Sequence, residues 1–393
     1  MGFYDFDKKL DRENTSSVKW SFIKEHTGVE DAIPLWVADM DFETVPEIIE
    51  KLAERAQHGI YGYTARTENY YRELIKWYGR RQGFHIRKEW ITHSSGVVNA
   101  IYNIIYALSE EGEGVIIQPP VYHPFARAIA LTGRKVLNNP LIIKNGRYEI
   151  DFEDLEIILK EGKARLLLLC NPHNPVGRVF TYEELKRLGE LSIRYGVTVI
   201  SDEIHSDFIY KAQTFVPFAS VSEELEQNSI ICTAPSKTFN LAGLSTSNII
   251  IPNKNLRERY NNYCELRGVK SFNIFGAIAS ETAYQYGEPW LEELLVYLEE
   301  NKDYAISYLQ TYLPEVKVIK PEGTYFLWVD FSELEYSKEE LEEFLIKEAR
   351  LWLNQGYIFG KEGEGFARIN LACRKDTLKE ALGRLHQAIK KAA

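Results

Sequence analysis

Short apolar runs alternate with helical patterns through the middle of the chain, and this alternation limits the fold more than any other feature. The runs begin at Val115, Lys135, Arg165, Val197, Ile230 and Ser247. Runs of four to eight β-forming residues separated by helices indicate a parallel or mostly parallel sheet with helices on both faces. We therefore predict an α/β fold built on a mixed, mostly parallel sheet.

Three helices are marked by their ends or their periodicity. Thr181 and Glu184 form a capping box that opens a helix, and Gly196 is expected to stop that helix just before the next strand. Ser337 opens a second capped helix, predicted over residues 339–353. Residues 291–313 form a long amphipathic pattern, which predicts one helix leading out of the larger domain.

The chain ends are expected to form a separate, smaller α+β domain. Strands are predicted within residues 324–332 and 365–372, flanking the second capped helix in a βαβ-like set. The apolar stretch at residues 32–42 is expected to pack with this C-terminal part. We predict that residues 1–48 and 289–393 form the small domain and that residues 49–288 form the large one.

Charge and composition exclude several classes of function. The 393 residues hold 47 Lys plus Arg against 57 Asp plus Glu, a net charge of -10, which disfavours a nucleic-acid partner. No run of eighteen apolar residues and no apolar leader occurs, so we expect a cytoplasmic protein that does not enter membranes. The four cysteines are scattered singly, which indicates reduced thiols and neither a zinc ribbon nor a disulfide framework.

Two charged residues follow predicted strands at the edge where open α/β sheets bind ligands. Lys237 lies among small and hydroxyl residues, which suits a desolvated amine that forms a Schiff base with a carbonyl cofactor. Asp202 is placed to hold a protonated pyridine nitrogen, the interaction that pyridoxal phosphate uses. The alternatives are a surface lysine at a strand end and a helix N-cap.

Other strand ends carry polar or aromatic side chains of the same kind. Asn174 is able to donate to a ring hydroxyl, or it forms a structural Asn-Pro turn. Tyr122 is able to lie flat against an aromatic cofactor, or it belongs to the core. Hydroxyls and a glycine in residues 92–100 precede an apolar helix and offer an anion site for a phosphate, or a plain serine N-cap. Arg368 is an isolated cation in an apolar strand, so a substrate carboxylate or a structural acid must face it.

Four motifs together resemble the fold-type I pyridoxal-phosphate enzymes: the lysine of SKTFNLAGL, the aspartate of SDEIH, the asparagine of NPHNPVG and the arginine of ARIN. Within that superfamily the chain is more similar to cystathionine β-lyases of the MalY/PatB type, which are cysteine-S-conjugate lyases, than to ordinary aminotransferases. The segments that carry this resemblance are WVADMDF, YGYTARTENYY, PPVYHPF, SDEIHSDF and APSKTFNLAGL. The resemblance covers nearly the whole chain and implies the aspartate-aminotransferase-like fold.

The resemblance also implies a role for each motif residue. Lys237 would form the Schiff base with pyridoxal 5'-phosphate and then move the Cα proton, while Asp202 would pair with the pyridine nitrogen. Tyr122 would stack on the ring, Asn174 would bond the ring oxygen, and Arg368 would bind the substrate α-carboxylate, with Asn174 also counted among the substrate-binding residues. Phosphate contacts are implied for Gly96, Val97, Ser236 and, from the neighbouring subunit of a homodimer, Tyr63. His205 occupies the position of a tyrosine that bonds the same ring oxygen in many aminotransferases.

The implied reaction is β-elimination of L-cystathionine or a related cysteine S-conjugate, which gives a thiol, pyruvate and ammonia in amino-acid metabolism such as methionine biosynthesis. A class I/II aminotransferase is the alternative, because both reactions share every step through loss of the Cα proton. Two departures from aminotransferases favour the lyase group. Ser245 stands where those enzymes carry a phosphate-binding arginine, and Ala234 replaces a serine that is another phosphate ligand.

Overall fold

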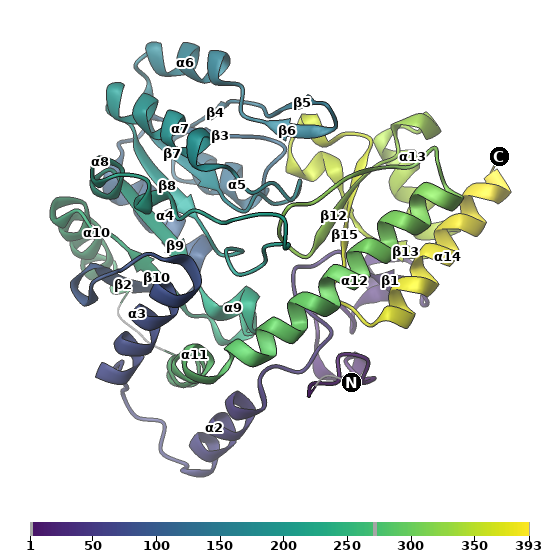
Figure 1. The fold of residues 1–393 in the computed structure, drawn as a ribbon, viewed down its shortest axis with the longest axis horizontal. Helices are drawn as coiled ribbons and strands as arrows, with labels where there is room; N and C mark the ends of the chain where they lie inside the picture. Colours follow the sequence, from purple (N-terminus) through teal and green to yellow (C-terminus); the bar gives the residue numbers. More distant parts are fainter. Residues whose placement is uncertain (1–2, 270–272, 393) are drawn as a thin grey trace.

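The protein is described from a computed structural model, over residues 3–269 and 273–392. Its larger sheet has seven strands in the order β2-β10-β9-β8-β7-β3-β4 (Figure 1). The strands are β2 (Ile91–Ser94), β3 (Gly114–Ile117), β4 (Lys135–Asn138), β7 (Ala164–Cys170), β8 (Thr198–Asp202), β9 (Ser229–Thr233) and β10 (Ser247–Ile250). Only β10 runs against its neighbours, so the carboxyl ends of the other six strands lie along one edge. The predicted mixed, mostly parallel sheet is confirmed.

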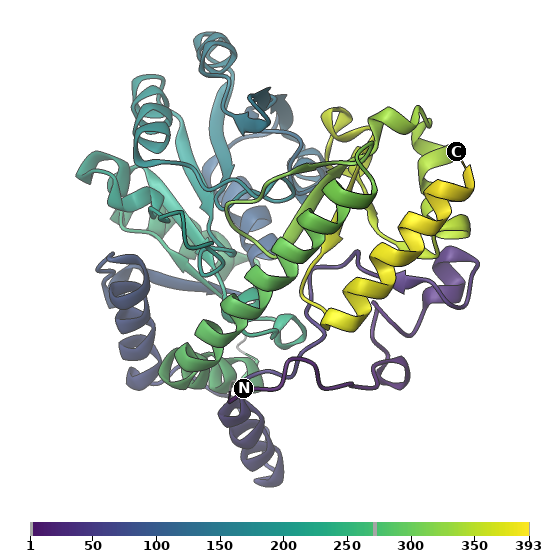
Figure 2. The same ribbon diagram turned by 45° about the vertical axis from the view of Figure 1, so that its right-hand side comes forward.

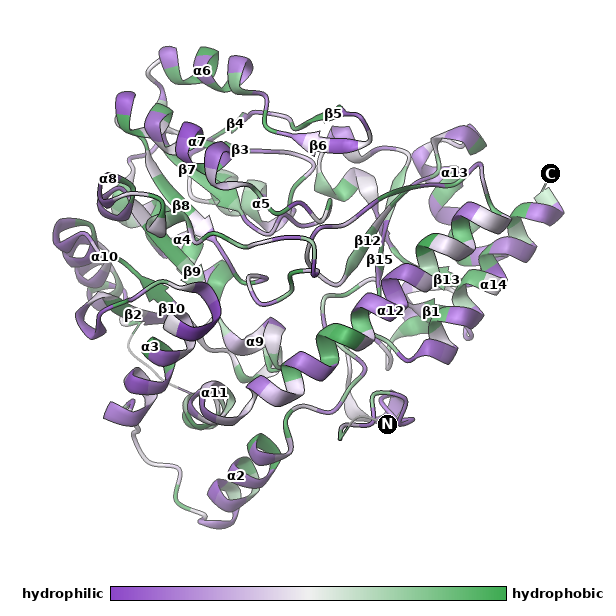
Figure 3. Cartoon of the chain, in the orientation of Figure 1, coloured by the Kyte–Doolittle hydropathy of each residue, from purple (hydrophilic) through white to green (hydrophobic). Residues whose placement is uncertain are grey.

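Helices cover both faces of this sheet because its strands are apolar on both sides. Leu166 and Leu168 of β7 pack on one face, whereas Leu167 and Leu169 pack on the other. The first face is covered by α4 (Val97–Leu108), α5 (Pro124–Leu131) and α10 (Lys254–Leu266). The second is covered by α3 (Glu68–Gln82), α6 (Phe152–Lys160), α7 (Tyr182–Arg194) and α11 (Ile274–Tyr286). Figure 3 shows hydrophobic strands between helices of mixed character.

A smaller antiparallel sheet lies near the C-terminus, with the order β11-β12-β15-β14. Its strands are β11 (Lys317–Ile319), β12 (Phe326–Asp330), β14 (Asn354–Gln355) and β15 (Phe366–Asn370). The long helix α12 (Glu288–Tyr312) reaches this sheet from the larger one, and α14 (Lys375–Ala392) runs beside it (Figure 2). Leu327, Ile369 and Leu382 belong to one core between these helices and the sheet.

The N-terminal segment forms a separate two-stranded sheet next to this smaller sheet, and Ile33 and Leu35 belong to the same core. Strand β1 (Ile33–Pro34) pairs in parallel with β13 (Leu351–Trp352), so the first and last parts of the chain lie side by side (Figure 2). The domain boundaries after residues 48 and 288 remain predictions. Among the described residues, no helix combines the length and the apolar character needed to cross a membrane.

The remaining elements are short or lie at the periphery. They are α1 (Ile23–Thr27), α2 (Pro46–Gln57), α8 (Glu223–Gln227), α9 (Pro235–Thr238), α13 (Lys338–Glu343) and the hairpin of β5 (Ile142–Lys144) and β6 (Arg147–Glu149). Both predicted capping boxes are present, at Thr181 and Ser337, and the long helix α12 is confirmed.

Two sequence-based expectations are corrected, and one strand was missed. The helix predicted over 339–353 ends in a π-helical turn by Glu348, and residues 351–352 instead pair as β13 with the N-terminal strand. The βαβ-like set is wrong in direction, because β12 and β15 pair antiparallel. Strand β2 was not predicted, since its sequence ITHS holds one apolar and three polar side chains.

A buried charge cluster fixes the N-terminal segment against the rest of the fold. The carboxylate of Asp41 accepts hydrogen bonds from Lys19 Nζ at 2.8 Å, Arg12 Nη1 at 2.5 Å and Trp20 Nε1 at 2.8 Å. Lys19 is fully buried, so its ammonium depends on the carboxylate of Asp41. Removing one partner of a buried pair leaves an uncompensated charge, which is strongly destabilising.

We expect Asp41→Asn to lower the free energy of unfolding by about 3 kcal/mol, because Lys19 and Arg12 lose their shared carboxylate. The matched control is Glu43→Gln, which removes a half-exposed ion pair with Lys8 and should cost under about 1 kcal/mol. Urea unfolding followed by circular dichroism measures both changes. Equal midpoints for the two variants would contradict the structural role of the cluster.

Candidate active site

The carboxyl ends of the parallel strands border a cavity of about 270 Å³. The structure brings together in its wall most of the side chains predicted for the site: Gly96, Val97, Tyr122, Asn174, Asp202, His205, Ser236 and Lys237. They come from loops after different strands, because strands that run in one direction end at one edge. Arg368 lies beside this group, and Tyr63 does not reach it.

Lys237 stands on the short helix α9, directly after β9. Its side chain is half-buried, and Nζ donates a hydrogen bond to the backbone oxygen of Ala38 at 2.6 Å. Burial, assisted by the nearby charge of Arg368, lowers the pKa of Lys237 to about 8. A sizeable fraction of the amine is therefore neutral in mildly alkaline solution, the form that adds to a carbonyl. The surface-lysine alternative does not describe this environment.

Asp202 ends β8 and is buried, with one carboxylate oxygen accepting the backbone N–H of Ile204 at 3.1 Å. Burial raises the pKa of Asp202 to about 7, although that hydrogen bond and the charge of Lys237 oppose the shift. The N-cap alternative fails, because the helical segment that comes next along the chain begins at Phe218. A cation in the cavity would favour the charged form of this carboxyl.

Arg368 is buried in β15 and holds two parts of the site together. Its Nη1 donates to Asn174 Oδ1 at 2.7 Å, and Nη2 donates to the backbone oxygen of Trp36 at 2.6 Å and to Asn354 Oδ1. Within the described residues no acidic side chain forms an ion pair with it, so the structural-acid alternative is not realised there. Burial lowers the pKa of Arg368 to about 10, and the guanidinium stays charged at neutral pH. This arrangement suits an anionic ligand.

His205 and Tyr122 border the same cavity. His205 is buried among Tyr325 and Phe326, and its Nδ1 has no hydrogen-bond partner within the described residues. Burial and the charges of Lys237 and Arg368 lower the pKa of His205 well below its usual value, so the ring is neutral. Tyr122 is half-buried at the start of α5, and burial next to Asp202 raises its pKa.

The amino end of α4 forms another part of the cavity wall. Gly96 is the N-cap and offers no side-chain cap, while Ser94 donates to Asn99 rather than to the helix backbone. The serine N-cap alternative is therefore wrong, and the first backbone N–H groups of α4 remain available to an anion. Ser236 adds a hydroxyl to the cavity wall, whereas Ala234 has none to offer.

Tyr63 lies on the loop between α2 and α3 with its side chain fully exposed. Its predicted contact with a neighbouring subunit's cofactor remains a prediction. Several cavity residues were not predicted: Ala38, Ser95, Cys170, Ser245 and Thr246. Ser95 lies within the predicted anion-binding stretch 92–100, and Ser245 was noted only as the position that lacks an arginine. The backbone oxygen of Ala38 could not be recognised from side-chain chemistry.

Residues 30–385 match the protein family described as aminotransferase class I and II. The chain belongs to this family. It is 44% identical to cystathionine beta-lyase PatB of Bacillus subtilis, over 98% of this chain and 100% of that protein. The family resemblance proposed from the sequence motifs is thus confirmed.

Solved structures agree with this assignment. Cystalysin from Treponema denticola, whose structure contains a pyridoxal 5'-phosphate cofactor, superposes with a TM-score of 0.96 at 38% identity, over 99% of this chain and 100% of that one. The pyridoxal-phosphate-bound C-S lyase of Staphylococcus hominis, complexed with L-cycloserine, gives 0.92 at 33% identity over 98% of both chains. The aspartate-aminotransferase-like fold is therefore confirmed.

The raised pKa of Asp202 gives a testable pH dependence in cofactor-free protein. Because the folded-state pKa of about 7 lies above the ordinary value of 3.8, its stabilising contribution is present at low pH and lost as pH rises through about 7. We expect Asp202→Asn to remove this loss of stability with rising pH and to raise the free energy of unfolding at pH 8 by roughly a few kcal/mol.

Thermal unfolding of the cofactor-free wild type and variant at pH 5.5 and pH 8, values that bracket about 7, measures the effect. Asp376→Asn is the control, since Asp376 is exposed at the start of α14. A wild type and an Asp202→Asn variant that lose stability in parallel between the two conditions would contradict this assignment.

Proposed function

We propose that the protein is a pyridoxal-phosphate-dependent carbon-sulfur lyase that converts L-cystathionine or related cysteine S-conjugates to a thiol, pyruvate and ammonia. The observation that carries the proposal is the joint presence, in one cavity, of the Lys237 amine and the buried Asp202 carboxyl, with Arg368 beside them. The sequence identity to an enzyme named cystathionine beta-lyase supports the choice of reaction.

The cavity residues fit pyridoxal 5'-phosphate. A buried carboxyl whose charged form a cation favours suits the protonated pyridine nitrogen, and the uncapped start of α4 suits the phosphate. His205 Nδ1 and the amide nitrogen of Asn174 provide polar groups for the ring oxygen. When bound, the cofactor supplies an electron sink for the negative charge that develops at Cα.

Lys237 is the proposed base for the Cα proton. Burial keeps its pKa near 8, so the free amine accepts a proton readily and the ammonium returns it without a large barrier. The Ala38 carbonyl holds Nζ at 2.6 Å and gives the protonated amine a fixed acceptor inside the cavity. The lysine is thereby oriented in both protonation states.

Arg368 is the proposed binding group for the substrate α-carboxylate. Its guanidinium is fixed by Asn174 and Trp36, so an incoming carboxylate meets a rigid, charged donor. Asn174 uses its oxygen for Arg368, which leaves its amide nitrogen as a donor toward the cavity. Orientation at the carboxylate places the Cα–H bond for Lys237, and loss of the Cβ thiolate completes the elimination.

We also propose a homodimer in which Tyr63 completes the neighbouring active site. Tyr63, Tyr61 and Ile60 are exposed on one loop, and such a cluster of large apolar side chains favours a protein partner. A cytoplasmic location remains a prediction from the sequence.

Purified protein incubated with L-cystathionine and no added keto acid is expected to release pyruvate and free thiol in equal amounts. The measurement couples pyruvate to lactate dehydrogenase and titrates thiol separately. An aminotransferase would consume the amino acid only when a keto acid is supplied. Turnover that strictly requires the keto acid would therefore replace the lyase assignment with its alternative.

Lys237→Ala is expected to abolish the near-visible absorption of the cofactor–lysine linkage and to slow elimination at least about 10³-fold, because it removes both the covalent partner and the base. Lys254→Ala is the control, since Lys254 is an exposed lysine at the start of α10. Absorption spectra and pyruvate release test both variants. A persisting band in Lys237→Ala would assign the linkage to another lysine.

A further inference from the structure

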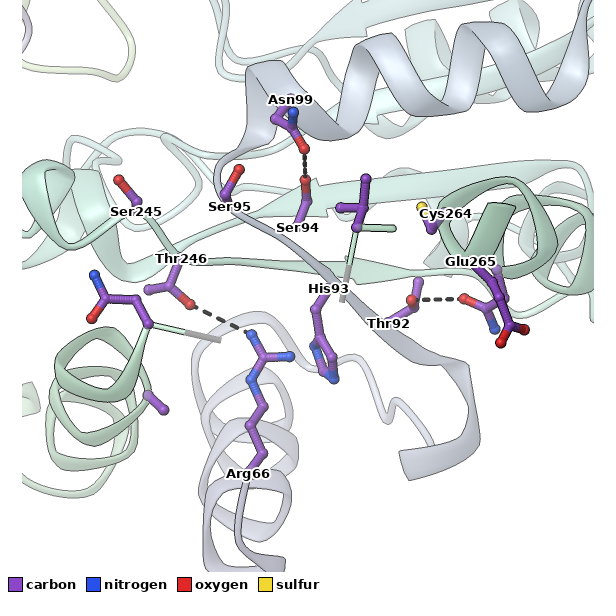
Figure 4. Close-up of a pocket in the computed structure, with 14 residues that line it drawn as sticks. Arg66, Thr92, His93, Ser94, Ser95, Asn99, Ser245, Thr246, Cys264 and Glu265 are labelled. Atoms are coloured by element: carbon purple, nitrogen blue, oxygen red, sulfur yellow. Dashed lines mark hydrogen bonds between the residues drawn. The ribbon is translucent and has the colours of Figure 1, made fainter. Parts of the chain in front are cut away.

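A second cavity, of about 460 Å³, adjoins the first one near the amino end of α4, where the cofactor phosphate is proposed to bind. Ser95, Asn99, Ser245 and Thr246 line both cavities, so their side chains form a thin wall between the two. Figure 4 shows this second cavity with Arg66 below the wall and its guanidinium directed toward Thr246. The mechanism proposed above makes no use of Arg66.

The wall is polar but carries no charge of its own. Ser245 and Ala234 stand where the family's aminotransferases have an arginine and a serine for the phosphate. The amino end of α4 supplies only about half a positive charge, whereas a phosphate brings up to two negative ones. Among the described residues that line the two cavities, the lysine and arginine side chains are Lys237 and Arg66. Lys237 is committed to the carbonyl end of the ligand.

Arg66 is held in place near Ser245, the position that lacks the arginine. Its Nη2 lies 3.5 Å from Thr246 Oγ1 and 3.3 Å from the backbone oxygen of Ser247, and its guanidinium packs over the ring of Tyr70. These contacts place the guanidinium against Thr246, the neighbour of Ser245 in the sequence, on the second-cavity side of the wall. In a partly buried site, where water screens charges less than in bulk solution, a cation attracts a nearby phosphate more strongly than at an open surface.

We propose that Arg66, which comes from the loop before α3, supplies the positive charge for the cofactor phosphate that position 245 lacks. This inference rests on the proposed function, because it assumes that pyridoxal 5'-phosphate is the ligand. Arg66 acts on the phosphate from the second cavity, with Thr246 and Ser245 presenting their hydroxyls between the two groups. It is thus a binding residue for the cofactor and takes no part in proton transfer.

The test compares two ligands that differ only in the phosphate. Cofactor-free wild type, Arg66→Gln and Arg66→Met are titrated with pyridoxal 5'-phosphate and, separately, with pyridoxal, and binding is followed by absorbance and tryptophan fluorescence. Both variants should bind pyridoxal 5'-phosphate at least about tenfold more weakly, with pyridoxal affinity unchanged. Arg66→Met is a second neutral variant with an unbranched side chain, and it serves if Arg66→Gln does not fold.

Two further variants sharpen the result. Arg66→Lys keeps the charge and should retain most of the affinity for the phosphorylated ligand. Arg80→Gln, the control, removes a half-exposed arginine of α3 that pairs with Glu288, and should change neither affinity. Adding Ser245→Arg to Arg66→Gln should restore tight binding of pyridoxal 5'-phosphate.

The outcomes separate this inference from the proposed function. Equal weakening for both ligands, or full affinity for pyridoxal 5'-phosphate in the neutral variants, would overturn the role of Arg66 alone. If titration of the wild type with pyridoxal 5'-phosphate produces neither an absorption band nor a fluorescence change, the proposed function is overturned instead.

Discussion

The hydrogen bonds of Arg368 connect the three parts of the chain on which the site depends. The arginine belongs to β15 in the small sheet, Asn174 follows β7 in the large sheet, and Trp36 lies in the N-terminal segment. Leaving the Nη donors of a buried guanidinium unpaired costs free energy, so these hydrogen bonds hold the three parts in a fixed relation, while Nε has no partner among the described residues. The cavity lies where they meet, and an anionic ligand would complete the coordination of the same cation.

Electrostatics in this cavity follow from burial without full compensation. Asp202 is held toward its neutral form and Lys237 toward its free amine, because each is removed from water with only partial help from a partner. Perturbed groups that gather in one cavity are a mark of function. A ligand with a cationic ring nitrogen and a carbonyl would satisfy Asp202 and Lys237, and its anionic groups would satisfy Arg368 and the amino end of α4. Such a ligand would then contribute to the stability of the folded state.

The sequence was informative where local chemistry and long-range position coincide. Alternating apolar runs predicted the large sheet, and the polar residues at their ends, such as Lys237 and Asp202, fell at one edge because parallel strands end together. Strand β13 was assigned to a helix, since its residues continue a helical pattern and only pairing with β1 makes them a strand. Arg66 could not be placed at all, because its relation to Thr246 spans 180 residues and depends on how α3 packs.

The segment WVADMDF shows how a sequence motif can act through its backbone. The carbonyl of Ala38 accepts hydrogen bonds from Lys237 and Tyr325, and those of Val37 and Asp39 accept from Asn370. These acceptors require the backbone path of the segment rather than particular side chains.

The acidic side chains of that segment secure the path from its other side. Asp39 and Asp41 bind Arg12 and the buried Lys19, which anchors the chain immediately beyond the carbonyl that holds Lys237. Losing a buried charge in this cluster would therefore disturb the site as well as the fold. The aspartates of the motif are thus positioning residues that fix the backbone oxygen bound by Lys237, and the charge of Asp39 also opposes the lowering of the Lys237 pKa.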